Sequence, residues 1–234
     1  MFDIAPAHMV GGHRVWPRAV AHCVAAPLPP EARVQQCSQQ SLGPDPAPST
    51  ALPSSLLIQW HITERCNLRC SHCYQEEDAA AAELTFVQQM ALLRQFEDLL
   101  RAIEAQRGTP VRAHVTITGG EPFLHQSFAE LLEATSARRD RWSFAVLSNG
   151  TVIDGSKARA LAKVRAGFVQ VSIEGTRATH DAIRGPGSHD AAVAGLRHLV
   201  RAGVPTMISF TATADNYREF PAVADLGRRL RLGP

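Results

Sequence analysis

From Ser54 onward, short β-like runs alternate with longer stretches whose apolar residues recur at helical spacing. The predicted strands are residues 56–62, 113–118, 143–148, 168–173 and 206–211. The predicted helices are residues 84–105, 128–137, 156–165, 191–202 and 220–230, with Thr85 as a candidate cap of the first. Strands that alternate with helices over short connections form a parallel sheet with right-handed crossovers. The sequence therefore predicts an α/β fold, a barrel or partial barrel of about five βα units.

The first part of the chain differs in composition from the rest. Residues 1–53 hold nine of the fifteen prolines in the 234-residue sequence. Proline removes a backbone donor and interrupts helices, so this density predicts an extended, poorly ordered lead-in. Residues 54–234 remain as one folded domain, and a hydrophobic fraction of 45% suits a substantial core.

Charge and hydropathy exclude two classes of partner. The formal net charge is only +2, with 24 basic against 22 acidic residues and no basic block, so no nucleic-acid footprint is expected. No apolar run approaches the length of a membrane span, and the first residues lack the pattern of a secretory signal. The sequence predicts a cytoplasmic protein with neither a nucleic acid nor a membrane as partner.

Three of the five cysteines fall in eight residues directly after the first predicted strand, as Cys66, Cys70 and Cys73. Three thiolates are one short of the four that close an iron–sulfur or zinc site. Three interpretations are open at this point. They are a cubane [4Fe–4S] cluster with one open iron, a structural zinc site completed by His61 or His72, and a grouping of buried or redox-active cysteines. The other two, Cys23 and Cys37, are expected to be reduced and unpaired, with supplementary metal ligation as the alternative.

Polar residues follow the carboxyl ends of the other predicted strands. In parallel sheets these ends and their loops form one rim, where active sites are built. The expected rim residues are Gly119, Gly120 and Glu121, then Ser148 and Asn149, then Ser172 and Glu174, and finally Thr211 and Thr213. A barrel with only a structural role does not need polar residues concentrated at one rim, so their placement favours a catalytic function.

Cys66, Cys70 and Cys73, followed by the aromatic Tyr74, resemble the CxxxCxxC signature of the radical S-adenosylmethionine (SAM) enzymes. The segment Gly119-Gly120-Glu121-Pro122 resembles the glycine-rich motif of that family. The resemblance covers roughly residues 54–230 and implies a partial TIM-like barrel of the radical SAM type. That barrel normally has six βα units, so the sixth is expected to be missing and the chain to be shortened at its C-terminus.

The resemblance also implies the chemistry. The three cysteines would hold a [4Fe–4S] cluster, and SAM would bind the fourth iron through its amino and carboxylate groups. One electron, from a donor such as flavodoxin or ferredoxin, would cleave SAM to a 5′-deoxyadenosyl radical that takes a hydrogen atom from substrate. The protein would contribute orientation and the exclusion of water.

Two motifs at the rim are expected to hold SAM directly. Gly119 and Gly120 lack Cβ atoms and would let a ligand approach the backbone, while Glu121 offers a carboxylate to the methionyl amine. The alternative for this segment is an ordinary strand-to-helix turn. The segment from His180 to Gly187 resembles the family motif H-D-x-x-R-G-x-G, in which Arg184 would pair with the SAM carboxylate. An Arg184 that only braces its loop is the alternative.

The remaining SAM contacts are expected from Ser148, Asn149, Ser172 and Glu174, whose side chains can bond the ribose hydroxyls. The family more often has aspartate where this chain has Glu174, so a solvated turn carboxylate stays open there. Tyr74 is expected to pack near the adenine or shield the cluster, with an aromatic core residue as the alternative.

The combination of motifs is most similar to the SPASM-associated maturases, the branch that modifies peptides and proteins. Members of that branch usually carry a cysteine-rich C-terminal extension, which this sequence does not contain. Two hypotheses follow. The first is a radical SAM enzyme that acts on a peptide or protein substrate. The second is a shortened, catalytically inactive remnant that retains the cluster and SAM sites.

Overall fold

The computed structural model describes residues 8–10, 13–15, 52–75 and 83–232. The chain divides into two compact units, Met1–Pro48 and Ser49–Pro234. In the first unit, β1 (His8–Val10) pairs antiparallel with β2 (His13–Val15). Most of the lead-in predicted over residues 1–53, including Cys23 and Cys37, lies outside the described residues, so its order and the boundary at residue 53 stay predictions.

The second unit is built on a parallel sheet of five strands in sequential order. These strands are β3 (Ser55–His61), β4 (Arg112–Thr118), β5 (Ser143–Ser148), β6 (Phe168–Ser172) and β7 (Thr206–Ser209). The α-helices are α1 (Phe86–Arg107), α2 (Phe128–Ser136), α3 (Gly155–Lys163), α4 (Arg177–Arg184), α5 (Ser188–Arg201) and α6 (Phe220–Arg229). Two 3₁₀ turns, η1 (Pro122–Leu124) and η2 (Tyr217–Glu219), complete the unit. The predicted α/β fold with five βα units is confirmed.

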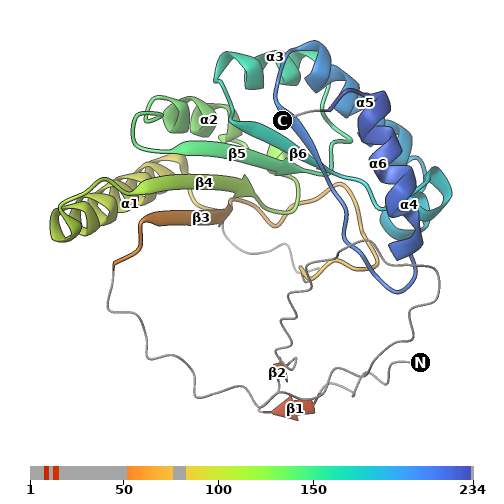
Figure 1. The fold of residues 1–234 in the computed structure, drawn as a ribbon, viewed down its shortest axis with the longest axis horizontal. Helices are drawn as coiled ribbons and strands as arrows, with labels where there is room; N and C mark the ends of the chain where they lie inside the picture. The colour runs from red at the N-terminus through yellow and green to blue at the C-terminus, as the bar shows by residue number, and fades with distance from the viewer. Residues whose placement is uncertain (1–7, 11–12, 16–51, 76–82, 233–234) are drawn as a thin grey trace, which may run out of the picture. The chain divides into compact units, whose positions relative to one another are not determined.

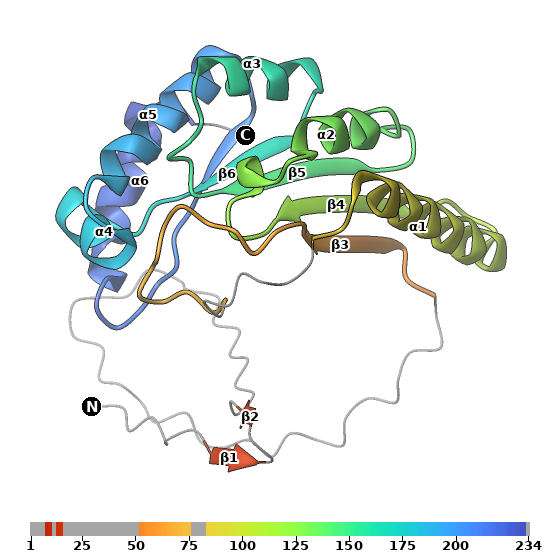
Figure 2. The same cartoon turned by 180° about the vertical axis from the view of Figure 1, so that it is seen from behind.

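The sheet is curved, and the helices cover its outer, convex face (Figure 1, and from behind in Figure 2). Trp60, Ile117, Val146 and Val169 lie side by side on four neighbouring strands, and all are buried. Because adjacent strands bring the same face of the pleat together, these side chains form one continuous apolar layer under the helices. The other face of the sheet is left for the loops at the strand ends.

Two elements begin or end where a side chain from another segment takes up backbone donors. Helix α5 begins at Ser188, three residues before the predicted start, because the Asp181 carboxylate accepts hydrogen bonds from the N–H groups of Gly187 (2.9 Å) and His189 (2.8 Å). Strand β7 ends at Ser209, two residues before the predicted end, and the N–H of Thr211 donates to the Glu174 carboxylate at 2.9 Å.

Helix α4 was not predicted. Of its eight residues only His180 is buried, so it presents no apolar stripe for a periodicity argument to detect. The predicted cap of α1 is confirmed, since Thr85 and Gln88 form a reciprocal capping box. None of the helices in the described ranges combines the length and the apolarity needed to cross a membrane.

Helix α5 packs unusually close to the loop after β5. A Cβ atom at Gly195 would lie 2.2 Å from the carbonyl oxygen of Gly150, and Gly150 itself has φ +77°. Both glycines are therefore needed, the first for the close approach of helix and loop and the second for its left-handed backbone. This contact sets how near α5 lies to the rim.

We expect Gly195→Ala to destabilise the protein by about 1–3 kcal/mol, because α5 must move away from the Gly150 carbonyl. Gly227→Ala in α6 is the matched control, since its added Cβ would meet nothing closer than Ile208 Cδ1 at 3.9 Å. Alanine in a helix interior gains roughly 0.5–1 kcal/mol over glycine, so the control should be neutral or stabilising. Urea unfolding measures both, and equal stability of Gly195→Ala and wild type would contradict this packing.

Candidate active site at the carboxyl ends of the strands

The carboxyl ends of the strands and the loops that follow them enclose a cavity of about 320 Å³. Its lining includes ten of the twelve residues predicted for the site: Cys66, Cys70, Cys73, Tyr74, Gly119, Gly120, Ser148, Asn149, Ser172 and Arg184. The other two, Glu121 and Glu174, are fully buried behind the wall. The cavity volume falls at the lower end of the range of about 300–1,000 Å³ that is typical of small-molecule sites.

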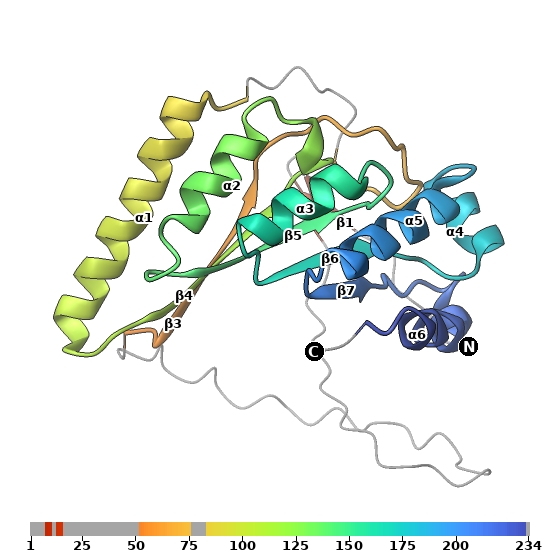
Figure 3. The same ribbon diagram turned by 90° about the horizontal axis from the view of Figure 1, so that it is seen from above.

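The loop that carries the cysteines continues from β3 and stays paired to the end of β4. The N–H groups of Ile62, Gly120 and Glu121 donate to the carbonyl oxygens of Thr118, Thr63 and Arg65 at 2.9, 2.7 and 2.8 Å. Figure 3 shows this segment, in orange, running past the strand ends towards α4. Main-chain pairing therefore fixes the start of the loop before any cysteine is reached.

Gly119 and Gly120 are required by this pairing. A Cβ at Gly120 would lie 2.4 Å from the carbonyl oxygen of Arg65, and one at Gly119 would lie 2.5 Å from that of Thr63. The space beside these glycines was expected to hold a ligand. In the structure the cysteine loop itself occupies that space, and the two glycines also line the cavity.

Three further contacts hold the cysteine loop. Arg65 forms a bidentate ion pair with Glu83, which precedes α1, at N···O distances of 2.9 and 2.7 Å. The Asn67 amide donates to Thr151 Oγ1 at 2.8 Å, after β5. The N–H of Ser71 donates to the carbonyl oxygen of Ile183 in α4 at 2.8 Å. The loop is thus tied to three elements that are distant in sequence.

The three thiols are free, and two of them, Cys66 and Cys70, lie near N–H donors. Cys66 Sγ is 3.5 Å from the N–H of Leu68 and 3.8 Å from Asn149 Nδ2, and Cys70 Sγ is 3.7 Å from Arg184 Nη1. Burial raises the pKa of the Cys70 thiol, while the Arg184 guanidinium acts against that shift. The donors beside these two sulfurs therefore oppose the desolvation that disfavours a thiolate.

Within the described residues, no three His, Cys, Asp or Glu side chains are close enough to share one metal ion. A cubane cluster makes a different demand, because each thiolate binds a separate iron at its own corner. The two histidines considered as a fourth zinc ligand differ in position. His72 lines the cavity, whereas His61 lies in β3 with its Nε2 3.3 Å from Gln59 Nε2 and 3.4 Å from Tyr74 Oη.

Glu121 makes contacts that differ from the expected direct contact with an amine. Its carboxylate accepts hydrogen bonds from Ser148 Oγ at 3.0 Å and from the N–H of Asn149 at 2.9 Å, and it caps η1 through the N–H of Phe123. Burial raises the pKa of Glu121 to about 7, against the hydrogen bonds that favour its ionised form. Glu121 thus ties the end of β4 to the end of β5, beneath the cavity.

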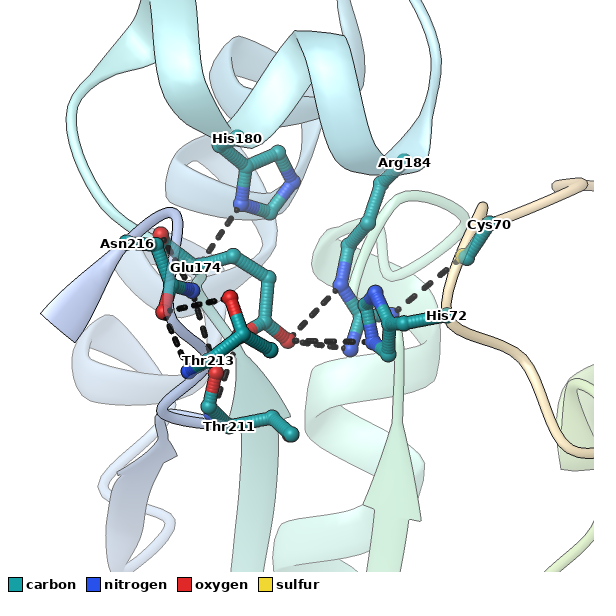
Figure 4. Close-up of polar contacts among 8 residues, drawn as sticks. All are labelled: Cys70, His72, Glu174, His180, Arg184, Thr211, Thr213 and Asn216. Carbon is teal, nitrogen blue, oxygen red and sulfur yellow. Dashed lines mark hydrogen bonds and ion pairs between the residues drawn. The ribbon is translucent and has the colours of Figure 1, made fainter. Parts of the chain in front are cut away.

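Glu174 and Arg184 form a buried ion pair (Figure 4). Arg184 Nε and Nη2 lie 3.0 and 2.5 Å from Glu174 Oε1, and the other carboxylate oxygen accepts from the N–H of Thr211. Glu174 is therefore neither a solvated turn residue nor a part of the cavity wall. Guanidinium has five N–H donors, of which Glu174 and Cys70 engage three. Within the described part of the chain, the other two have no partner and can bind a ligand.

The aromatic residue after the third cysteine is at the mouth of the cavity. Tyr74 is 76% exposed, so it is not a core residue. Gln170, which was not predicted as a site residue, lines the cavity from β6. A signal was present, because Gln170 and Ser172 alternate with the buried Val169 and Val171 and must face the opposite side of the sheet.

We expect Glu121→Gln to remove a pH dependence of stability. Below pH 4.5 the carboxyl group is protonated in the folded and unfolded protein, and between pH 4.5 and about 7 only the unfolded chain loses the proton. The free energy of unfolding of wild type relative to Glu121→Gln should fall over this interval, on the order of 3 kcal/mol. Urea unfolding at several pH values measures the difference.

Glu130→Gln is the control for this prediction, because Glu130 is an exposed carboxylate on the neighbouring helix α2. It should follow the wild-type pH profile. A constant stability difference between wild type and Glu121→Gln across the interval would contradict the assigned burial of Glu121.

Comparison with known proteins identifies the family of this chain. The model of the radical SAM superfamily matches residues 60–227. The chain is 35% identical over 188 residues to Fe-coproporphyrin III synthase of Methanosarcina barkeri, covering 76% of this chain and 44% of that protein. It is 32% identical over 181 residues to mycofactocin maturase MftC of Mycobacterium tuberculosis, covering 76% of this chain and 43% of that protein.

Among solved structures, the fold is similar to that of anSMEcpe with bound AdoMet, another name for SAM, and the Kp18Cys peptide. The TM-score is 0.62 at 18% identity, covering 76% of this chain and 49% of that chain. The chain thus spans less than half the length of these relatives. It belongs to the radical SAM superfamily, whose cofactors are a [4Fe–4S] cluster and S-adenosylmethionine.

Proposed function

We propose that residues 54–234 form the SAM-cleaving domain of a radical SAM enzyme, with Cys66, Cys70 and Cys73 as ligands of three irons and the fourth iron open to SAM. When bound, the cluster and SAM supply one-electron cleavage of a carbon–sulfur bond and a 5′-deoxyadenosyl radical that abstracts hydrogen from substrate. The observation that carries the proposal is that three free thiols of one loop line a single cavity together with the Gly119–Gly120 corner.

The donors around the sulfurs support the cluster assignment. Hydrogen bonds to ligand sulfurs and the charge around them set the properties of iron–sulfur clusters. Cys66 lies near a backbone N–H and the Asn149 amide, and Cys70 lies near a guanidinium. These fixed donors offset the negative charge of thiolates in a site that is partly shielded from water.

Several polar groups of the cavity wall have a proposed contact with SAM. The two N–H groups of Arg184 that remain free are proposed to hold the SAM carboxylate. Ser148, Asn149 and Ser172 are proposed to bond its amine and ribose hydroxyls, since all three line the cavity. Tyr74, at the mouth, is proposed to cover the adenine or the cluster. Glu121 and Glu174 would act through the residues they hold.

For the substrate, a peptide or protein is the first proposal, because the motifs are most similar to those of the maturase branch and MftC is a maturase. An electron donor such as flavodoxin or ferredoxin would act as a partner. A tetrapyrrole is the second candidate, because the Fe-coproporphyrin III synthase of M. barkeri is 35% identical to this chain. The polar wall residues described above serve SAM in either case, so they do not discriminate between these substrates.

The primary test is anaerobic reconstitution with iron and sulfide, followed by dithionite and SAM. We expect a [4Fe–4S] spectrum and production of 5′-deoxyadenosine, and we expect Cys70→Ala to lose both. Cys37→Ala is the control, because it removes a cysteine outside the loop and should retain both. Stoichiometric zinc without acid-labile sulfide would overturn the cluster, and a cluster without 5′-deoxyadenosine would favour the inactive remnant.

The two substrate classes are separated by a second experiment on the reconstituted protein. A peptide encoded beside the gene should gain or lose mass in the presence of SAM and dithionite, as detected by mass spectrometry. Fe-coproporphyrin III, the compound that the relative from M. barkeri is named for making, is the comparison, and its absorption spectrum reports binding directly. Binding of the tetrapyrrole without change in any peptide would reject the first proposal in favour of the second.

A further inference from the structure

One charged side chain of the cavity wall faces a cysteine sulfur and is held there by a buried anion. Arg184 Nη1 lies 3.7 Å from Cys70 Sγ, while its Nε and Nη2 are bound to Glu174 Oε1. We propose that Glu174 is a positioning residue that keeps the Arg184 guanidinium beside Cys70 and thereby raises the reduction potential of the cluster. This inference rests on the proposed function, because it requires a cluster on Cys70.

The ion pair lies where charge has strong effects. The Glu174 side chain is 1% exposed and that of Arg184 is 11% exposed. Interactions between charges strengthen as water is excluded, so a cation here acts on its neighbours more strongly than a surface cation. A buried ion pair is also expensive to desolvate and is weak evidence for stability alone. A function in orienting Arg184 would explain why a buried ion pair occurs at this position.

The position of Glu174 is fixed by segments on both sides of it. Its backbone N–H donates to His180 Nδ1 at 3.1 Å, and its backbone carbonyl accepts from Asn216 Nδ2 at 3.2 Å. Its second carboxylate oxygen accepts from the N–H of Thr211 at 2.9 Å. These contacts leave Oε1 directed at Arg184. Among the described residues, the His72 imidazole also lies near this oxygen, with its Nε2 3.8 Å away.

The order in which the two charges lie relative to Cys70 determines whether the pair raises or lowers the reduction potential. Figure 4 shows the guanidinium between the Glu174 carboxylate and Cys70, so the positive end of the pair faces the sulfur. Reduction adds one negative charge to a cluster, and a nearby cation with an N–H directed at a ligand sulfur stabilises the reduced form. Arg184 should therefore raise the potential, and the more distant Glu174 should lower it only in part.

The length of Glu174 matters in this arrangement. An aspartate would keep the charge but withdraw the carboxylate by one methylene group towards β6. Arg184 would follow it, away from Cys70, or lose one of its two hydrogen bonds. Glu174→Asp therefore separates the positioning of Arg184 from the charge of residue 174.

The test is a redox titration of the reconstituted [4Fe–4S] cluster, followed by electron paramagnetic resonance. Arg184→Gln should lower the potential enough to reduce the ratio of reduced to oxidised cluster at least tenfold at a fixed potential, which is about 59 mV for one electron. Glu174→Asp should shift it in the same direction by less. Arg177→Gln is the control, because Arg177 lies on the same helix with its side chain 68% exposed.

An unchanged potential in Arg184→Gln would overturn the inference, as would a shift of Glu174→Asp in the positive direction. If Arg184→Gln does not retain iron and sulfide, the potential of Glu174→Asp decides whether the inference holds. This variant keeps the positive charge of Arg184 and the negative charge of residue 174. Failure of wild type to assemble a cluster would instead overturn the proposed function. A wild-type cluster that cleaves SAM, with no shift in the variants, would reject this inference alone.

Discussion

The site depends on main-chain hydrogen bonds between the cysteine loop and the corner that follows β4. Three N–H···O bonds extend the pairing of β3 and β4 beyond the last residue of the sheet, to Arg65. Cys66 is the next residue. Side chains alone fix a loop poorly, because each long side chain loses rotamer freedom when it is held. Continuing the parallel pairing instead gives the first cysteine almost the rigidity of the sheet, and only glycine at positions 119 and 120 permits it.

Two buried glutamates extend this construction around the rim. Glu121 follows β4 and accepts a hydrogen bond from the N–H of Asn149, which follows the adjacent strand β5. Glu174 follows β6 and accepts a hydrogen bond from the N–H of Thr211, which follows the adjacent strand β7. Each carboxylate joins neighbouring strand ends at the point where sheet pairing stops and backbone donors need other partners. Each also holds a residue of the cavity wall, Ser148 in one case and Arg184 in the other. The wall is therefore supported from behind.

Much of this fold could be predicted from sequence, because alternating apolar residues reveal strands that are buried on one face. β5 was predicted with the bounds observed, Ser143–Ser148, and the placement of the rim residues follows from the direction of parallel strands. Helix α4 could not be found in this way, since it buries only His180. The cap on α5 and the end of β7 depend on carboxylates six or more residues away, which local patterns do not contain.

The roles of Glu121 and Glu174 were beyond sequence reasoning for a different reason. A carboxylate in a rim motif is equally suited to a ligand or to backbone donors, and only burial decides between them. Both side chains are fully buried here, and their oxygens are occupied by the chain's own N–H and O–H groups. The resemblance named the rim residues, and the structure shows which of them line the cavity and which are buried behind it.

The central claim is that three thiolates from one loop hold a cluster whose fourth iron is open to SAM. Mössbauer spectroscopy of protein reconstituted with ⁵⁷Fe tests it most directly, because it resolves the iron sites individually. Adding SAM should change the spectrum of one iron in four and leave the three thiolate-bound irons as they were. Four equivalent irons that do not respond to SAM, or no cluster signal at all, would contradict the account.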